Sequence, residues 1–259
     1  MRSTQHASPC AKVALSIALG LAAALCQAGT ANNPIPPTMN HAQPRSDTLS
    51  ARQQAIVPIA AFAAAGDLPR LSTALSNGLD AGLTINDTKE ILVQLYAYAG
   101  FPRSLNAVGE LMKTLDDRKK RGIQDVEGRT PNRAAPKGDA LMAAGTANQT
   151  KLSGAPVTGA LFDFAPAIND YLRAHLFGDI FERDNLDWQS RELATVSMLS
   201  ALQGVDSQLQ AHVRISMNTG LTEGQLRQLI DVLADRVAAE PAQRAREALA
   251  RHLATTGPR

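Results

Sequence analysis

The sequence predicts an all-α protein built from two similar helical halves. Of its 259 residues, 44% are hydrophobic but only 4% are aromatic, and alanine and leucine dominate. Ala and Leu lose little on entering a helix, whereas strands favour aromatic and β-branched residues. Helix-like patterns occupy residues 48–123 and 159–255, and the two segments resemble each other when they are aligned without a gap. A duplicated helical bundle is the expected fold.

The segment 1–31 is typical of a secretory signal peptide. Arg2 and Lys12 precede an apolar run from Val13 to Leu25, and small residues follow it. Such a run is shorter than a membrane-spanning helix. The alternatives are a buried N-terminal helix, or a lipoprotein signal ending at Cys26 in which Leu25 is an unsuitable preceding residue. The expected location is periplasmic or secreted.

Removal of residues 1–31 would change the net charge of the chain and remove its cysteines. The remaining chain holds 24 basic and 24 acidic residues, so no surplus charge favours nucleic acid or an anionic membrane. Cys10 and Cys26 lie inside this segment. The mature chain would therefore have no disulfide and no thiolate nucleophile. Residues 32–47, rich in Pro, Asn and Gln, are expected to form a loose arm.

The predicted repeat rests on matching glycine and threonine residues at the expected helix ends. When Gly66 is aligned with Gly204, the Gly-Leu-Thr at 82–84 falls on the Gly-Leu-Thr at 220–222. Each half is read as a helix, a turn, a second helix, a Gly-Leu-Thr break and a third helix. Glycine ends a helix and threonine caps the next one. Residues 124–158, rich in Gly, Pro, Ala and Thr, are predicted to be a linker.

Two polar residues of the second half share faces with apolar neighbours. Glu192 and His212 lie on the two helices of a hairpin through Gly204, and a rise of about 1.5 Å per residue lets them face one another. A carboxylate that orients an imidazole makes a proton-transfer pair. The alternative is a histidine satisfied within the core. The aligned positions of the first half hold Gln54 and Ala74.

The first half ends in a polar and aromatic cluster at a helix break, within residues 94–112. Pro102 forces Phe101 out of the helical region. Arg103 supplies a donor fork suited to a carboxylate, although a helix corner with an exposed arginine is the alternative. The second half is expected to end before any equivalent segment.

A metal site is a further alternative. His175, Asp179 and Glu182 are spaced i, i+4 and i+7, so they share one face of a helix. Gly178 between them argues for a solvated or capping role instead, and no metal is expected.

The segments 176–233, with RELATV, QAHV and GLT, and 91–107, with YAGFP and LNA, resemble the carboxymuconolactone decarboxylase family. The arrangement is similar to that of its two-repeat members. The resemblance implies an alkylhydroperoxidase D-like helical bundle, association into rings and hence a trimer of two-repeat chains, and a site without metal or cofactor. It implies catalytic roles for Glu192 and His212. It also suggests substrate contacts from Tyr98, Arg103 and Asn106, and Arg214 is a second candidate to hold a carboxylate.

The family contains two chemistries. Its peroxidase branch uses a C-x-x-C pair, and its decarboxylase branch removes carbon dioxide from a lactone acid. No cysteine lies between Glu192 and His212 or in YAYAGFP, which excludes thiolate chemistry. The sequence therefore predicts cofactor-free acid/base chemistry on a small carboxylated lactone or enolisable acid. The alternative is a family member that has lost its cysteines and serves as a non-catalytic oligomeric binding protein.

Overall fold

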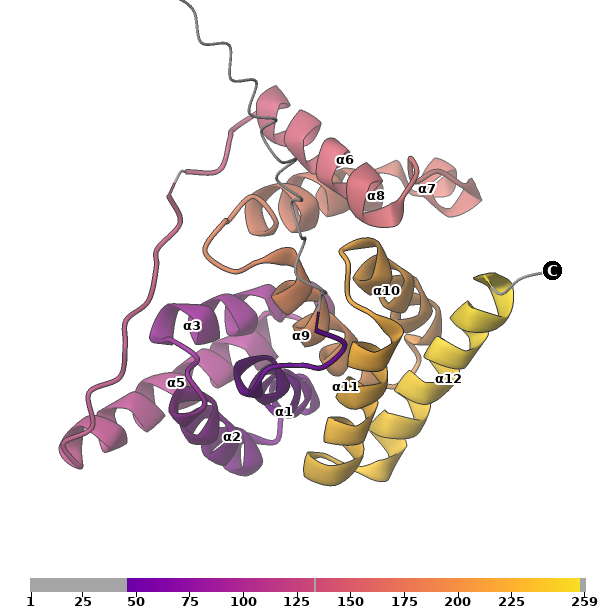
Figure 1. The fold of residues 1–259 in the computed structure, drawn as a ribbon. Coiled ribbons are helices and arrows are strands. Elements are labelled where there is room, and N and C mark those ends of the chain that lie inside the picture. The colour runs from indigo at the N-terminus through magenta and orange to yellow at the C-terminus, as the bar shows by residue number, and fades with distance from the viewer. Residues whose placement is uncertain (1–45, 133, 257–259) are drawn as a thin grey trace, which may run out of the picture. The chain divides into compact units, whose positions relative to one another are not determined.

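The computed structural model describes residues 46–132 and 134–256, and within these ranges it contains helices and no strand (Figure 1). The predicted all-α class is therefore confirmed. The signal peptide predicted at residues 1–31, and most of the arm predicted at 32–47, lie outside the described residues. The first half of the chain forms α1 (Ala51–Ala65), α2 (Leu68–Asp80), α3 (Ile85–Gln94), α4 (Tyr96–Ala99) and α5 (Phe101–Lys120).

The rest of the chain is also helical. It forms α6 (Asp139–Ser153), α7 (Ala160–Phe164), α8 (Pro166–Tyr171), the π-helix η1 (Leu172–Ile180), α9 (Trp188–Ala201), α10 (Asp206–Asn218), α11 (Glu223–Arg236) and α12 (Ala239–Thr256). None of the described helices is both long and apolar enough to cross a membrane.

Helices α1 and α9 pack against each other at the centre of the fold. Both are buried around most of their circumference, α1 from Ala55 to Ala64 and α9 from Ser190 to Ser200. The segment Ala55–Ala64 of α1 is apolar on all sides, as expected of a core helix, and its many small side chains allow α9 to approach closely. Helices α2 and α5 pack on α1, while α10 and α12 pack on α9. The polar residues between Ser190 and Ser200 of α9 are consequently placed inside the protein.

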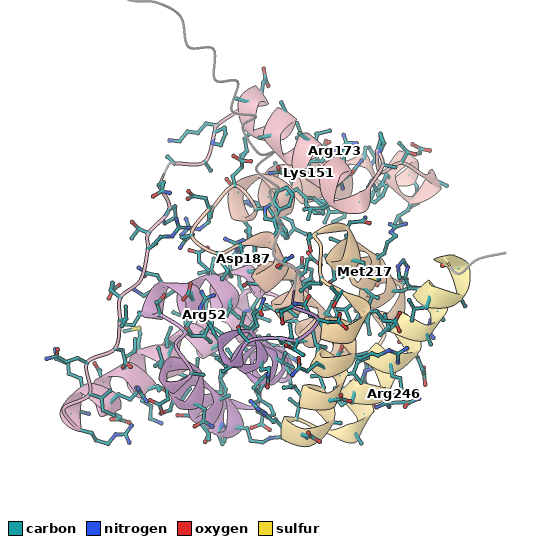
Figure 2. The ribbon with its side chains drawn as sticks, in the orientation of Figure 1. Arg52, Lys151, Arg173, Asp187, Met217 and Arg246 are labelled. Carbon is teal, nitrogen blue, oxygen red and sulfur yellow. The ribbon has the colours of Figure 1, made fainter. Side chains whose placement is uncertain are left out.

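The start of α9 is set by the N-cap Asp187, labelled in Figure 2. Its carboxylate accepts hydrogen bonds of 2.8 Å from the Ser190 backbone N–H and from the Ser190 hydroxyl. These bonds satisfy donors that the first turn of a helix leaves unpaired. The cap therefore fixes the register of the helix that carries Glu192.

Replacing Asp187 with alanine is expected to lower the free energy of unfolding by about 1 kcal/mol, the usual loss for an N-cap. Asp187→Asn is the matched control, since its amide oxygen still accepts from Ser190. Urea unfolding of the three proteins measures the difference. An alanine variant as stable as the wild type would show that the cap contributes nothing.

The helices α1, α2, α3 and α5 begin within one residue of the positions at which α9, α10, α11 and α12 begin when Gly66 is aligned with Gly204. Helices α2 and α10 then begin and end at corresponding positions, and the two glycines precede them with φ angles of 77° and 75°. Thr84 and Thr222 each close a capping box, at the starts of α3 and α11. Helix α12 begins at the position corresponding to the start of α5, so the second half continues where the sequence comparison expected it to end.

Helix α6 lies inside the segment predicted to be a linker. Gly145 lets it approach η1 closely, because a Cβ at this position would collide with the Arg173 carbonyl oxygen. The pair builds a small second core that includes Leu152 and Phe177 and is flanked by Trp188 at the start of α9. Figure 1 shows α6, α7 and α8 together, apart from α1, α2 and α5.

Candidate active site

Glu192 is fully buried on the second turn of α9. Helix α9 lies between α1 and α10, so this carboxylate cannot reach solvent from the helix that carries it. One of its oxygens, Oε1, has no hydrogen-bond partner among the described residues. A buried, half-satisfied carboxylate is costly, and such groups are concentrated at functional sites.

The other oxygen of Glu192 meets His212 of α10. His212 Nδ1 lies 2.8 Å from Glu192 Oε2, and His212 is only 8% exposed. An ionised carboxylate can only accept, so Nδ1–H is the donor and Nε2 is left for another partner. The hairpin through Gly204 thus places the two predicted residues in direct contact.

Tyr98 of α4 completes the group from the first half of the chain. Its ring meets the His212 ring edge-on, with centroids 5.4 Å apart. Burial raises the pKa of Tyr98, and the charge of Glu192 raises it further, so the phenol stays protonated at physiological pH. The Tyr98 hydroxyl and the hydroxyl of Ser216, one turn after His212, are buried without a partner in the described structure. The group therefore holds a neutral O–H donor beside an oriented imidazole.

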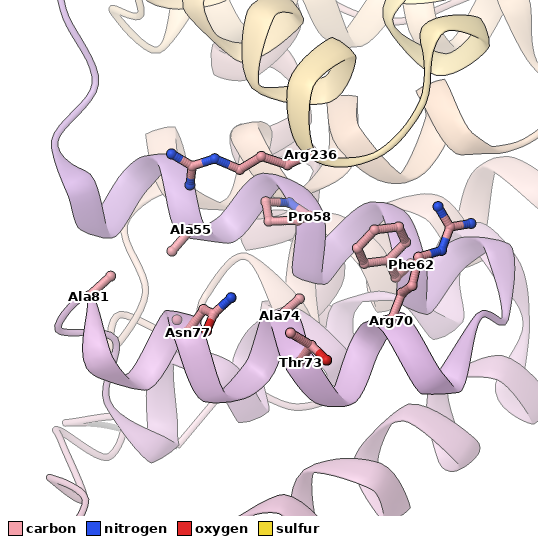
Figure 3. Close-up of a pocket in the computed structure, with 10 residues that line it drawn as sticks. Ala55, Pro58, Phe62, Arg70, Thr73, Ala74, Asn77, Ala81 and Arg236 are labelled. Carbon is pink, nitrogen blue, oxygen red and sulfur yellow. The ribbon is translucent and has the colours of Figure 1, made fainter.

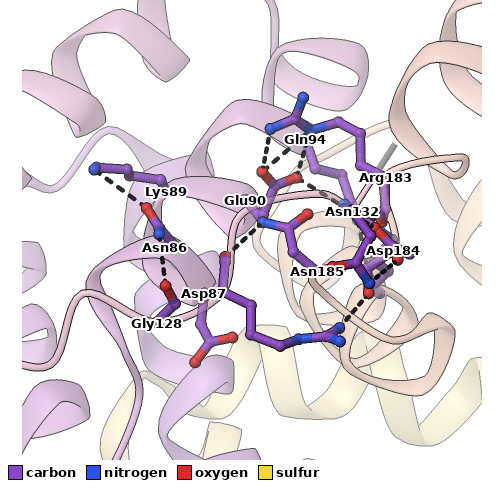
Figure 4. Close-up of polar contacts among 12 residues, drawn as sticks. Asn86, Asp87, Lys89, Glu90, Gln94, Gly128, Asn132, Arg183, Asp184 and Asn185 are labelled. Atoms are coloured by element: carbon purple, nitrogen blue, oxygen red, sulfur yellow. Dashed lines mark hydrogen bonds and ion pairs between the residues drawn. The ribbon is translucent and has the colours of Figure 1, made fainter. Parts of the chain in front are cut away.

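A buried ion-pair network supports this site, and the sequence analysis missed it. Arg191, next to Glu192, is fully buried, and its Nη2 donates to Glu90 Oε2 at 3.1 Å and to the Arg183 carbonyl at 2.8 Å. Arg183 donates to both oxygens of Glu90, at 2.6–3.1 Å, and Figure 4 shows these two residues facing each other. Two guanidinium groups thus share one carboxylate.

The network also joins α3 to α9 through an amide. Gln94 Nε2 donates to the Arg191 carbonyl at 3.0 Å and to Thr195 Oγ1 at 2.7 Å, while Gln94 Oε1 accepts from Arg191 Nη1 at 3.2 Å. Since α3 leads directly into α4, these bonds hold Tyr98 against α9. Arg191 carried no clear sequence signal, because α9 contains several polar residues and only the structure shows that the helix is buried on most sides. Glu90 carried none either.

Glu90 gives the fold an acid sensitivity. Burial alone would raise the pKa of Glu90, but the hydrogen bonds from Arg183 and the charge of Arg191 lower it overall. The unfolded chain therefore binds the proton first, and stability is complete above the ordinary pKa of 4.5 and is lost as the pH falls through the lower folded value. We expect the melting temperature to decline in this acidic window.

Thermal melts from about pH 7 to about pH 3 test this expectation. Glu90→Gln removes the titrating group, so its melting temperature should start lower and decline less steeply with acid than that of the wild type. Parallel curves for the two proteins would show that other carboxylates, such as Asp87 beside Arg52, cause the decline.

The other predicted substrate contacts, Arg103, Asn106 and Arg214, form no direct bond to the pair among the described residues. Arg103 is half-buried on α5, with its Nε beside Gly66. Asn106 of α5 and Arg214 of α10 are exposed. Among the described residues, no hydrogen bond or ion pair joins these three side chains to Glu192 or His212.

The residues weighed as metal ligands have other partners. His175 Nδ1 lies 2.7 Å from Asp179 Oδ2 on η1, and Glu182 accepts from Asn148 at 2.8 Å. Within the described ranges, no group of three or more His, Cys, Asp or Glu side chains has a geometry that could hold a metal ion.

Comparison with known proteins finds a family match in the second half of the chain. Residues 166–251 match the Carboxymuconolactone decarboxylase family. This segment belongs to that family. It runs from α8 into α12 and includes both Glu192 and His212. The helical bundle is consistent with the alkylhydroperoxidase D-like fold of the carboxymuconolactone decarboxylase-like proteins.

One relative is the 4-carboxymuconolactone decarboxylase of Acinetobacter baylyi. It is 31% identical over 70 residues, which are 27% of this chain and 52% of the relative. The chain thus spans about half the length of the curated relative it matches. The likeness supports the assignment of this segment to the carboxymuconolactone decarboxylase family.

Proposed function

We propose that the protein performs cofactor-free acid/base chemistry, a decarboxylation or a proton transfer, on a small carboxylated lactone or enolisable acid. The observation that carries the proposal is the 2.8 Å contact between His212 Nδ1 and Glu192 Oε2 inside the core. An imidazole oriented by a carboxylate is an efficient proton donor and acceptor near neutral pH. The name of the Acinetobacter relative supports a lactone acid as the substrate class.

In the decarboxylation, the bond between the substrate carbon and its carboxylate breaks and carbon dioxide leaves. The electron pair moves onto the lactone carbonyl as an enolate. The imidazolium of His212 then delivers a proton from Nε2 to the carbon, and solvent restores the proton. Glu192 holds the imidazole by Nδ1 and stabilises its charged form.

Tyr98 fits the role of enolate stabiliser. Its hydroxyl is buried, protonated and unpartnered beside His212 in the described structure, so it can donate a hydrogen bond to the oxygen on which charge develops. Arg103, Asn106 and Arg214 remain proposed contacts for the carboxylate of the substrate. Among the described residues, none of the three is hydrogen-bonded to Glu192 or His212.

Self-association and export are also proposed. Large apolar side chains are exposed on α5, α7 and α8: Phe101, Leu105, Phe164 and Tyr171. Such side chains favour an interface with another copy, in keeping with the proposed trimer. The proposed periplasmic or secreted location rests on the pattern of residues 1–31.

A non-catalytic binding protein is the second candidate function. It is favoured by the first half of the chain, where Gln54 and Ala74 stand in place of the acid/base pair.

A screen for carbon dioxide release tests the proposed function. Purified protein is incubated with carboxylated lactones and β-keto acids, and a hydroperoxide reduction assay is run beside it. The proposal predicts carbon dioxide release from at least one lactone acid and no peroxide reduction. Peroxide turnover without release of carbon dioxide would contradict it.

A further inference from the structure

A pocket of about 300 Å³ is lined mostly by the first half of the chain, and neither Glu192 nor His212 lines it. It is formed by α1, α2 and the last residue of α11, as Figure 3 shows. This volume lies at the lower end of the range for small-molecule sites. Its walls are made by Ala55, Pro58, Phe62, Ala74, Asn77 and Arg236, with four further residues of α2 and its end.

The pocket occupies the place that corresponds to the Glu192–His212 site. In the gap-free alignment of the two halves, Ala74 stands where the second half has His212, and Gln54 stands where it has Glu192. Arg236 stands where the first half has Tyr98. An alanine methyl in place of an imidazole leaves room between α1 and α2. Where the second half has an acid/base pair, the first half therefore has an open space beside a guanidinium group.

The lining combines an apolar body with a cation. Ala55, Pro58 and Phe62 of α1 face Ala74 of α2 across the pocket. Arg236 is exposed at the C-terminal end of α11, and its one hydrogen bond within the described residues goes from Nη2 to Gln54 Oε1 at 3.4 Å. A bond of this length leaves the guanidinium largely available for an anion.

Arg70, the second cation of the pocket, is already engaged. Its Nε donates to Asp67 Oδ2 at 2.6 Å, its Nη1 donates to the Val237 carbonyl at 3.1 Å, and its guanidinium lies over the Phe62 ring. In Figure 3 it lies at the opposite end of the pocket from the guanidinium of Arg236, with Pro58 and Phe62 between them. Arg236 is thus the group that can receive a carboxylate.

We propose that this pocket binds a small organic carboxylate with a compact apolar body, and that it does so without turning it over. The carboxylate pairs with Arg236, and the apolar body lies against Pro58, Phe62 and Ala74. No residue of the lining can act as the oriented acid/base pair of the second half. The site is independent of the proposed reaction at His212.

Isothermal titration calorimetry with benzoate as the probe tests the proposal. Benzyl alcohol has the same ring without the charge. Arg236→Gln removes the cation from an exposed position, and Asn77→Phe fills the pocket from an exposed position, so neither variant disturbs the core. We expect benzoate to bind, and each variant to weaken binding about ten-fold or more. Benzyl alcohol should bind correspondingly worse than benzoate.

His212→Ala separates this site from the proposed active site. The proposal predicts that benzoate affinity is retained in His212→Ala, whatever happens to turnover. Loss of binding in His212→Ala, with binding unchanged in Arg236→Gln and Asn77→Phe, would place the ligand at the other site and overturn the proposal. Absence of measurable binding at about 10 mM benzoate would also overturn it.

Discussion

Replacing His212 with alanine is expected to lower kcat/KM on an active lactone acid by about 10²–10⁴-fold. The imidazole is the group that delivers the proton, and Glu192, which is engaged at Nδ1, cannot take its place. The effect should fall mainly on kcat, because the histidine acts as charge develops rather than in holding the ground state. Rates with carbon dioxide detection measure it.

Two variants sharpen the His212 result. Glu192→Gln keeps the shape of the pair but removes the charge that stabilises the imidazolium, so we expect a smaller loss. His175→Ala removes an exposed histidine of η1 and should leave the rate unchanged. Equal activity of His212→Ala and wild type, with both folded by circular dichroism, would remove His212 from the mechanism.

Glu90→Ala is expected to lower the free energy of unfolding by about 3–5 kcal/mol, the usual cost of leaving a buried charge without its partner. Arg191 is fully buried and would keep only the Arg183 carbonyl and Gln94 as acceptors. The same change would also release Arg183. Urea unfolding with a common slope for all variants measures the loss.

A neighbouring surface pair provides the control for Glu90. Glu127 lies 3.1 Å from Lys89, but both side chains are exposed, so Glu127→Ala should cost at most about 1 kcal/mol. The double variant Glu90→Leu/Arg191→Met removes both buried charges and should recover part of the stability. Equal losses for Glu90→Ala and Glu127→Ala would show that the network does not stabilise the fold.

The ends of helices and the contacts within a helical hairpin could be predicted from the sequence, because they depend on residues close together in the chain. Gly66 ends α1 in the left-handed conformation, Gly204 has a matching positive φ in the turn between α9 and α10, and Thr84 and Thr222 cap α3 and α11. The contact between Glu192 and His212 followed from helical rise and a short turn, because the two helices that carry them are consecutive in the sequence. Such features need no knowledge of distant residues.

Interactions between distant segments could not be predicted. Glu90 and Arg191 are 101 residues apart, and only the packing of α3 on α9 brings them together. Helix α6 was missed because its packing on η1, where Gly145 lies against the Arg173 carbonyl oxygen, involves residues distant in the sequence. The pocket beside Ala74 was missed because a space left by a small side chain produces no pattern in the sequence.

The most direct test of the central claim, that His212 delivers a proton to a carbon that has lost carbon dioxide, is turnover of a lactone acid in D₂O. The product is examined by proton NMR for deuterium at that carbon. The account predicts one deuterium per carbon dioxide released by the wild type, and loss of both signals in His212→Ala. Carbon dioxide release at the wild-type rate by His212→Ala would contradict it.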